Sequence, residues 1–243
     1  MLFRFFTPVP RAYTFMDSKY LDGLSQSPVA ADAAPSERLL FLRKTYSLVL
    51  LGITLFAATM LGFGKVALVT DASLWIYTSS RWTSLILMIG GGVVVRMLAR
   101  KRVVGFTFYL AYAVLLGLLI APFAAMAGPE TVGTAALLTT AIFAGLTVYA
   151  FVTKTDFSWL GGALSIGLFA MIGIGVASMI FGWSLGSWYS IAGALLFSGY
   201  ILYDTSNIVR TNRVDEAVPA AIELFTSVIM LFWHLLSLLS NRD

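Results

Sequence analysis

The chain has 243 residues, of which 59% are hydrophobic and only 12% are charged, whereas a soluble domain averages about a quarter charged residues. Apolar runs of about 20 residues recur along it, and each can cross a hydrocarbon core about 30 Å thick as a helix. This composition predicts an all-α, polytopic membrane protein. It excludes a transmembrane β-barrel, whose strands alternate over about 10 residues, and the absence of cysteine excludes disulfides and thiolate metal sites.

The first 36 residues differ from the rest because they mix charged residues with Ser, Pro and Ala. They lack the apolar segment and small-residue cleavage site of a secretory signal. We therefore expect residues 1–36 to form a disordered cytoplasmic tail, with a partner-binding tail as the alternative. Pro35-Ser36-Glu37 then predicts a helix start, and residues 37–243 are expected to form one membrane domain.

Seven apolar runs predict a bundle of seven transmembrane helices joined by short connections. The second run is interrupted by the glycines at 90–92, and Pro122 should bend the third. The expected spans are 46–68, 82–98, 104–126, 132–152, 158–181, 187–209 and 217–239.

Lys and Arg residues set the expected orientation of this bundle. With the N-terminus in the cytoplasm, thirteen of the 16 Lys and Arg residues lie in inner segments, which is a clear positive-inside bias. The Arg100-Lys101-Arg102 turn contributes most to it. Seven spans then place the C-terminus outside, in what we expect to be a bacterial inner membrane. The pI near 9.4 therefore reflects topology, and no basic patch interleaved with aromatic residues suggests nucleic acid as a partner.

Two carboxylates lie inside apolar runs, Asp204 in the sixth span and Glu223 near the start of the seventh. An ionised side chain at membrane depth costs about 2.5–3.5 kcal/mol on insertion scales, so such residues face a bundle interior, a partner or water. In the expected topology both acids lie near the inner end of neighbouring antiparallel helices, where they can meet. The alternative is that each snorkels or pairs separately with Arg96, Arg100 or Arg210.

Polar residues on the same helix faces can support these two acids. Tyr200 and Asn207 lie one turn to either side of the acid in the sixth span and can form local hydrogen bonds. Glu223, Ser227 and His234 share one face of the seventh span. The single histidine is a candidate for titration near neutral pH, although a lone histidine on an apolar helix more often has a structural hydrogen bond.

We expect no enzymatic activity, because the sequence contains no motif that carries it. It has no H-E-x-x-H, G-x-S-x-G, Walker A or dinucleotide-binding pattern. An intramembrane aspartyl protease is a weak alternative, since Asp204 is followed by Thr205 rather than by the glycine of an aspartyl dyad helix.

Four segments together resemble the Bax inhibitor-1 family. One of them, SGYILYDTSNI, ends the sixth span with a Tyr-Asp pair, and another, FLRKTY, opens the first span in the family manner. The similarity extends over about residues 38–240. It implies a central seventh helix wrapped by six others, a pH-sensitive calcium leak in some members, and regulation of membrane proteases or cell survival in others. The four segments are Phe41–Tyr46, Gly105–Gly117, Thr140–Asp156 and Ser198–Ile208.

One departure from the family pattern concerns the second aspartate of its calcium-leak members. Aligning Glu223–Phe232 with the family's Leu-Tyr-Leu-Asp segment puts Ser227 at that position and Met230 where an Asn is usual. Asp204 carries over, and Glu223, one turn from Ser227 on the same face, would have to replace the missing carboxylate. Bacterial members that resemble modulators of a membrane-bound AAA protease also lack this aspartate.

Two functions stay open at this point. The first is a proton-sensitive cation leak, with Ca²⁺ as the expected ion, in which Asp204, Glu223 and Ser227 form the gate and ion pathway. Two close carboxylates cannot both ionise cheaply, so they can share a proton, and protonation would break contacts with arginine and shift a closed–open equilibrium. Such a site is a gate rather than a high-affinity cage, because Ca²⁺ prefers six to eight oxygens. The second is a non-enzymatic modulator that binds a membrane-bound AAA protease or translocon.

Overall fold

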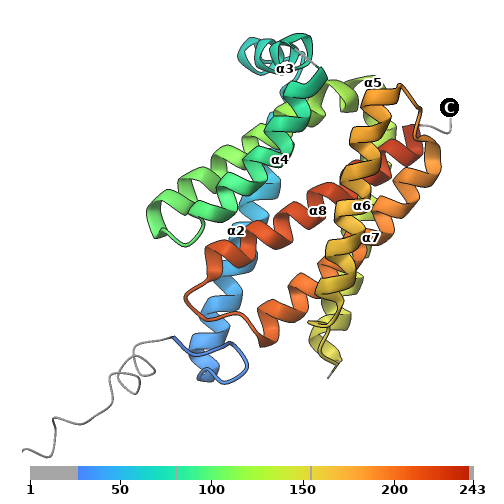
Figure 1. The fold of residues 1–243 in the computed structure, drawn as a ribbon. Helices are drawn as coiled ribbons and strands as arrows, with labels where there is room; N and C mark the ends of the chain where they lie inside the picture. Colours follow the sequence, from blue (N-terminus) through green and yellow to red (C-terminus); the bar gives the residue numbers. More distant parts are fainter. Residues whose placement is uncertain (1–26, 80, 154, 241–243) are drawn as a thin grey trace, which may run out of the picture.

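The computed structural model describes residues 27–79, 81–153 and 155–240. Within these residues, all regular structure except one isolated β-bridge is helical, which confirms the all-α prediction. The helices pack side by side as a bundle (Figure 1). They are α2 (Pro35–Leu61), α3 (Ala67–Ser79), α4 (Arg81–Leu98), α5 (Arg102–Val152), α6 (Leu160–Phe181), α7 (Gly186–Arg210) and α8 (Ala217–Ser240).

Four of these helices, α2, α5, α6 and α8, are long and apolar enough to cross a membrane. A fifth possible span is the pair α3 and α4, which is bent by 111°. The prediction of an integral membrane protein is therefore supported, whereas length and composition alone do not reproduce the count of seven spans. The expected first span, 46–68, also differs from α2, which begins eleven residues earlier and ends at Leu61. Gly62 and Gly64 end it, and Gly64 takes a left-handed φ of 73° that glycine favours.

The helix α5 consists of two helical halves joined at Gly128. This residue has φ 84° and ψ 160°, a conformation essentially restricted to glycine. Pro129 follows, and its fixed φ suits the first turn of a new helix. The break therefore lies in the connection expected between the spans 104–126 and 132–152, whereas Pro122 lies within the first helical half.

The two halves of α5 run in opposite directions along α2. In the first half, the Tyr109 hydroxyl donates a hydrogen bond to the Leu48 carbonyl at 2.8 Å. In the second half, the ring of Phe151 lies 6.0 Å from that of Tyr46. Both halves of α5 therefore contact the middle of α2, and the turn at Gly128 lies toward the end of α2, because Ala125 and Pro129 line one cavity together with Leu61.

The C-terminal helix α8 occupies the centre of the bundle. Its most apolar window is 67% buried, against 17% to 44% for the other three long apolar helices. It contacts α2, α4, α5 and α7. This arrangement agrees with the central last helix that the family resemblance implies, and it explains why residues of α8 contact so many other elements.

The segment before α2 is held against the connection between α7 and α8. Two backbone hydrogen bonds, of 2.8 and 3.1 Å, join residues 28–30 to residues 212–214, and Ala30 is fully buried. Residues 28–36 were expected to belong to a disordered tail, 1–36, but they form this pairing and the first turn of α2. Residues 1–26 of that tail lie outside the described residues.

Candidate functional site

The two helices that carry the predicted acids meet at a direct polar contact. The Ser227 hydroxyl of α8 donates a hydrogen bond to Oδ2 of Asp204 of α7, at 2.6 Å. Each of these residues is only 5% exposed. The structure thus joins the acid of the sixth expected span to a hydroxyl of the seventh.

The polar stretch around Asp204 is buried as a block in α7. Thr205, Ser206 and Asn207 are buried with it. The Ser206 hydroxyl accepts a hydrogen bond from the backbone N–H of Phe157 at 3.2 Å, which fixes the connection between α5 and α6 against α7. The 25-residue helix α7 therefore carries a continuous polar segment that is buried inside the bundle.

Glu223 lies one turn from Ser227, toward the connection between α7 and α8. It lines a polar cavity of about 250 Å³ together with Arg96 from the last turn of α4, Arg100 just after that helix, and Glu216 directly before α8. Glu223 acts on Asp204 electrostatically, whereas the hydrogen bond of Asp204 goes to Ser227. Glu223 is therefore the acid at the cavity, and Asp204 is the more deeply buried one.

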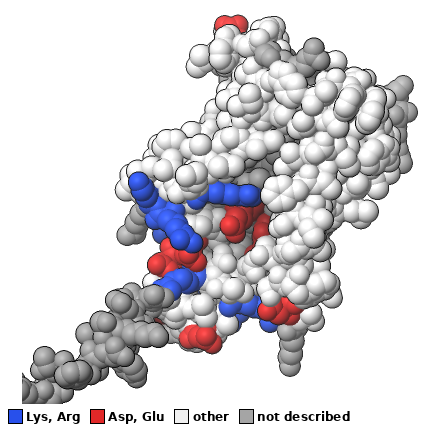
Figure 2. Space-filling view, in the orientation of Figure 1, with Lys and Arg blue, Asp and Glu red and all other residues white. Residues whose placement is uncertain are grey.

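Arg96 is the basic residue that interacts with both acids. Its guanidinium interacts electrostatically with Asp204 and with Glu223. Arg96 and Arg100 are both exposed, so the cavity is accessible from this end of the bundle. Figure 2 shows the charged side chains of this face gathered around the same end, whereas the upper part of the face is almost free of them.

Of the remaining residues predicted to support the site, one interacts with Asp204 and the others hold helices and their ends in place. Tyr200 interacts electrostatically with Asp204. Asn207 is buried, and its backbone carbonyl accepts the N–H groups of the two residues after α7. Arg210 donates a hydrogen bond to the Thr153 carbonyl at the end of α5. This hydrogen bond joins α7 to α5 and does not involve an acid.

His234 lies apart from this site. Its ring is 5.7 Å from that of Tyr189 and 5.6 Å from that of Phe197. It also covers Gly193, where a Cβ atom would come within 2.4 Å of the ring. Eleven residues separate His234 from Glu223, or about 16 Å at 1.5 Å per residue along a helix. Packing accounts for the position of this histidine.

Sequence reasoning missed a group of hydroxyls on another side of α7. Tyr46 of α2 lies within interaction range of Thr147 of α5 and Thr205 of α7. Within the described residues these three hydroxyls are buried and make no hydrogen bond of ordinary geometry. The signal was present in the sequence, since Tyr46 ends the FLRKTY segment and Thr205 directly follows Asp204.

The described residues contain no group of three or more His, Asp or Glu side chains arranged to hold a metal ion. Asp204, Glu223 and Ser227 together offer fewer oxygens than the six to eight that Ca²⁺ prefers. The cavity has two acidic and two basic residues in its lining, so the arrangement can exchange protons at its acids, but it does not enclose an ion.

Comparisons with known proteins give a consistent result. A family profile described as inhibitor of apoptosis-promoting Bax1 matches residues 38–243. An uncharacterised protein of Campylobacter jejuni is 32% identical over 233 residues, which cover 92% of this chain and 98% of that protein. Protein lifeguard 4 of Mus musculus is 30% identical over 222 residues, covering 90% and 92%. Bax inhibitor 1 of Schizosaccharomyces pombe is 27% identical over 236 residues, covering 92% and 85%.

Proposed function

Because the chain belongs to the Bax inhibitor-1 family, we propose that it is an integral membrane protein that acts as a proton-sensitive cation leak, with Ca²⁺ as the expected cargo. The observation that carries this proposal is the buried contact between Asp204 and Ser227, one helical turn along α8 from Glu223, which lines the charged cavity. A carboxylate kept at membrane depth by so specific a partner is a functional candidate, because apolar residues would fill the same space at lower cost.

The proposal includes a topology of seven crossings with the N-terminus in the cytoplasm. The crossings are α2, α4, the two halves of α5, α6, α7 and α8. The distribution of basic residues supports this orientation, because most of those in the described part of the chain lie where α2 begins and α4 ends. At that end are Arg38, Arg43, Lys44, Arg96, Arg100, Lys101, Arg210 and Arg213.

In the proposed mechanism the cavity end faces the cytoplasm, and Glu223 and Asp204 act in series. A cation reaches Glu223 through the cavity and then meets the contact between Asp204 and Ser227, which closes the path between α7 and α8. Protonation of the two acids removes the negative charge that Arg96 attracts. It thereby shifts the population from a closed toward an open arrangement of these helices.

The test is Ca²⁺ flux into liposomes that contain the purified chain, measured over a range of pH. Asp204→Asn mimics the protonated acid, so the pH dependence of the flux should disappear while the protein still folds. Asp71→Asn is the matched control, since Asp71 is an exposed acid of α3, away from the site. An absence of flux in the unmodified protein, or an unchanged pH response in well-folded Asp204→Asn, would refute the proposal.

The serine at position 227 favours a second candidate function. Since the family's paired aspartates are not both present, the chain also fits a non-enzymatic modulator of a membrane-bound AAA protease or a translocon. Co-purification of such a complex with the tagged full chain from its native membrane supports this alternative. If the same preparation is inactive in the flux assay, the alternative replaces the leak.

A further inference from the structure

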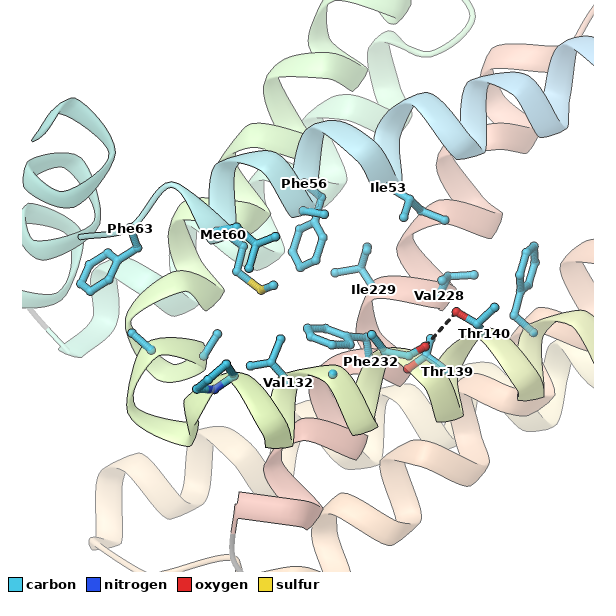
Figure 3. Close-up of a pocket in the computed structure, with 18 of the residues that line it drawn as sticks. Ile53, Phe56, Met60, Phe63, Val132, Thr139, Thr140, Val228, Ile229 and Phe232 are labelled. Atoms are coloured by element: carbon cyan, nitrogen blue, oxygen red, sulfur yellow. Dashed lines mark hydrogen bonds between the residues drawn. The ribbon is translucent and has the colours of Figure 1, made fainter. Parts of the chain in front are cut away.

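A second cavity, of about 660 Å³, lies between α2, the second half of α5 and α8. Figure 3 shows Phe56 and Met60 of α2 facing Val132 of α5 across it, with Ile229 and Phe232 of α8 nearby. Its volume is within the range of small-molecule sites, about 300–1,000 Å³. This cavity shares no lining residue with the charged one around Glu223.

The lining of this cavity calls for an apolar occupant. Its side chains are almost all aliphatic or aromatic, and the two hydroxyls among them are already satisfied. Thr139 donates to the carbonyl of Ala135 at 2.7 Å, and Thr140 donates to that of Ala136 at 2.8 Å. A polar ligand would therefore find few partners along the walls.

The dimensions of the cavity match one leaflet of a bilayer. Along α2 its lining extends from Leu50 to Leu61, which is about 16 Å at 1.5 Å per residue. That is about half of a hydrocarbon core of about 30 Å. The acyl chain of a lipid is apolar and has this length, so it matches the cavity.

One charged residue, Lys65, lines the rim of the cavity, and it is exposed. It lies in the connection between α2 and α3, two residues before α3 begins at Ala67. The partial positive charge at the start of α3 adds to that of the ammonium group. The rim is therefore complementary to a negatively charged head group.

We propose that this cavity is a binding site for an anionic phospholipid, whose acyl chain lies between α2 and the second half of α5 and whose phosphate contacts Lys65. The proposal depends on the location of the chain in a membrane and not on the cation leak. The site differs from the general lipid surface of the bundle, because three helices line the space for the acyl chain and one cation selects the head group.

The test uses the full chain in phosphatidylcholine vesicles that contain a trace of lipid with a photoreactive acyl chain. The probe lipid has either a phosphatidylglycerol or a phosphatidylcholine head group, and mass spectrometry locates the labelled peptides. Gly133→Leu fills the cavity, since Gly133 lines it and the described residues leave more than 4 Å free around an added Cβ. Gly145→Leu is the matched control, because Gly145 has the same free space on the same half of α5 but does not line the cavity.

We expect labelling to concentrate on the cavity-lining peptides of α2 and α5, to be stronger with phosphatidylglycerol, and to fall in Gly133→Leu but not in Gly145→Leu. Lys65→Gln should reduce the preference for phosphatidylglycerol about fivefold, which corresponds to about 1 kcal/mol for one basic residue at a membrane surface. Equal labelling in the two glycine variants would overturn the proposal, as would labelling spread evenly over the outer helices. Cross-links between two copies of the chain through this cavity would also overturn it, since a second copy would then be the occupant.

Discussion

The contact between Asp204 and Ser227 allows a quantitative prediction for Ser227→Ala. The hydrogen bond is 2.6 Å long, within the range of about 2.5–2.7 Å typical of hydroxyl–carboxylate bonds. Both residues are buried, so water cannot readily replace the lost donor. A buried acceptor left without its donor costs about 1–3 kcal/mol, and a charged one costs more. We therefore expect Ser227→Ala to lower the free energy of unfolding by about 2–3 kcal/mol.

The measurement is reversible unfolding by SDS in mixed micelles, with Ser240→Ala as the matched control. The Ser240 hydroxyl lies on the same helix but donates to the Leu236 carbonyl of that helix, at 2.8 Å. A double-mutant cycle with Asp204→Asn should give a coupling energy of about 0.5–3 kcal/mol, as for residues in direct contact. Equal losses in the two serine variants, or additive effects in the cycle, would show that the contact between α7 and α8 carries no special energy.

Four further predictions concern two glycines, the serine of the site and the topology. Gly128→Ala should destabilise the protein by about 1–3 kcal/mol in the same unfolding assay, because an alanine is strained at φ 84° and ψ 160°; an unchanged stability would contradict the assigned turn. Gly193→Ala should cost about 1–3 kcal/mol through overpacking against the His234 ring, and combining it with His234→Ala should recover part of the loss. Ser227→Asp should increase Ca²⁺ flux in liposomes, and an inert variant would argue against a shared acidic site. A reporter fused to the C-terminus should be active only outside the cytoplasm, and cytoplasmic activity would refute the seven crossings or their orientation.

The sequence predicted those features of the fold that depend on local hydrophobicity. The expected spans 187–209 and 217–239 agree with α7 and α8 to within one residue at each end. The acid at position 204 was recognisable because a carboxylate in an apolar run is costly wherever the helix lies. The helical class and the membrane location follow from the same property and needed no tertiary information.

The features that the sequence did not predict depend on contacts or on backbone conformation. The break in α5 lies in the connection expected between the spans 104–126 and 132–152, but the sequence did not single out Gly128, where φ is positive, as the residue that makes it. The helix continues through Pro122, since membrane helices tolerate proline when neighbouring groups satisfy the backbone. Likewise, Ser227 was recognised as a position in the family pattern, yet its direct bond to Asp204 joins residues from two helices, and local periodicity cannot report such a bond.

The backbone pairing between residues 28–30 and residues 212–214 also affects the order in which the protein is completed. These segments lie near opposite ends of the chain, so the second is synthesised long after the first. At about 5–20 residues per second, the wait is about ten to forty seconds. During that time the segment before α2 has no partner, although the helix after it is already made. The pairing closes only when α7 has been synthesised, so its formation marks a nearly complete bundle, and a nascent chain that stalls earlier keeps this segment open to quality-control factors.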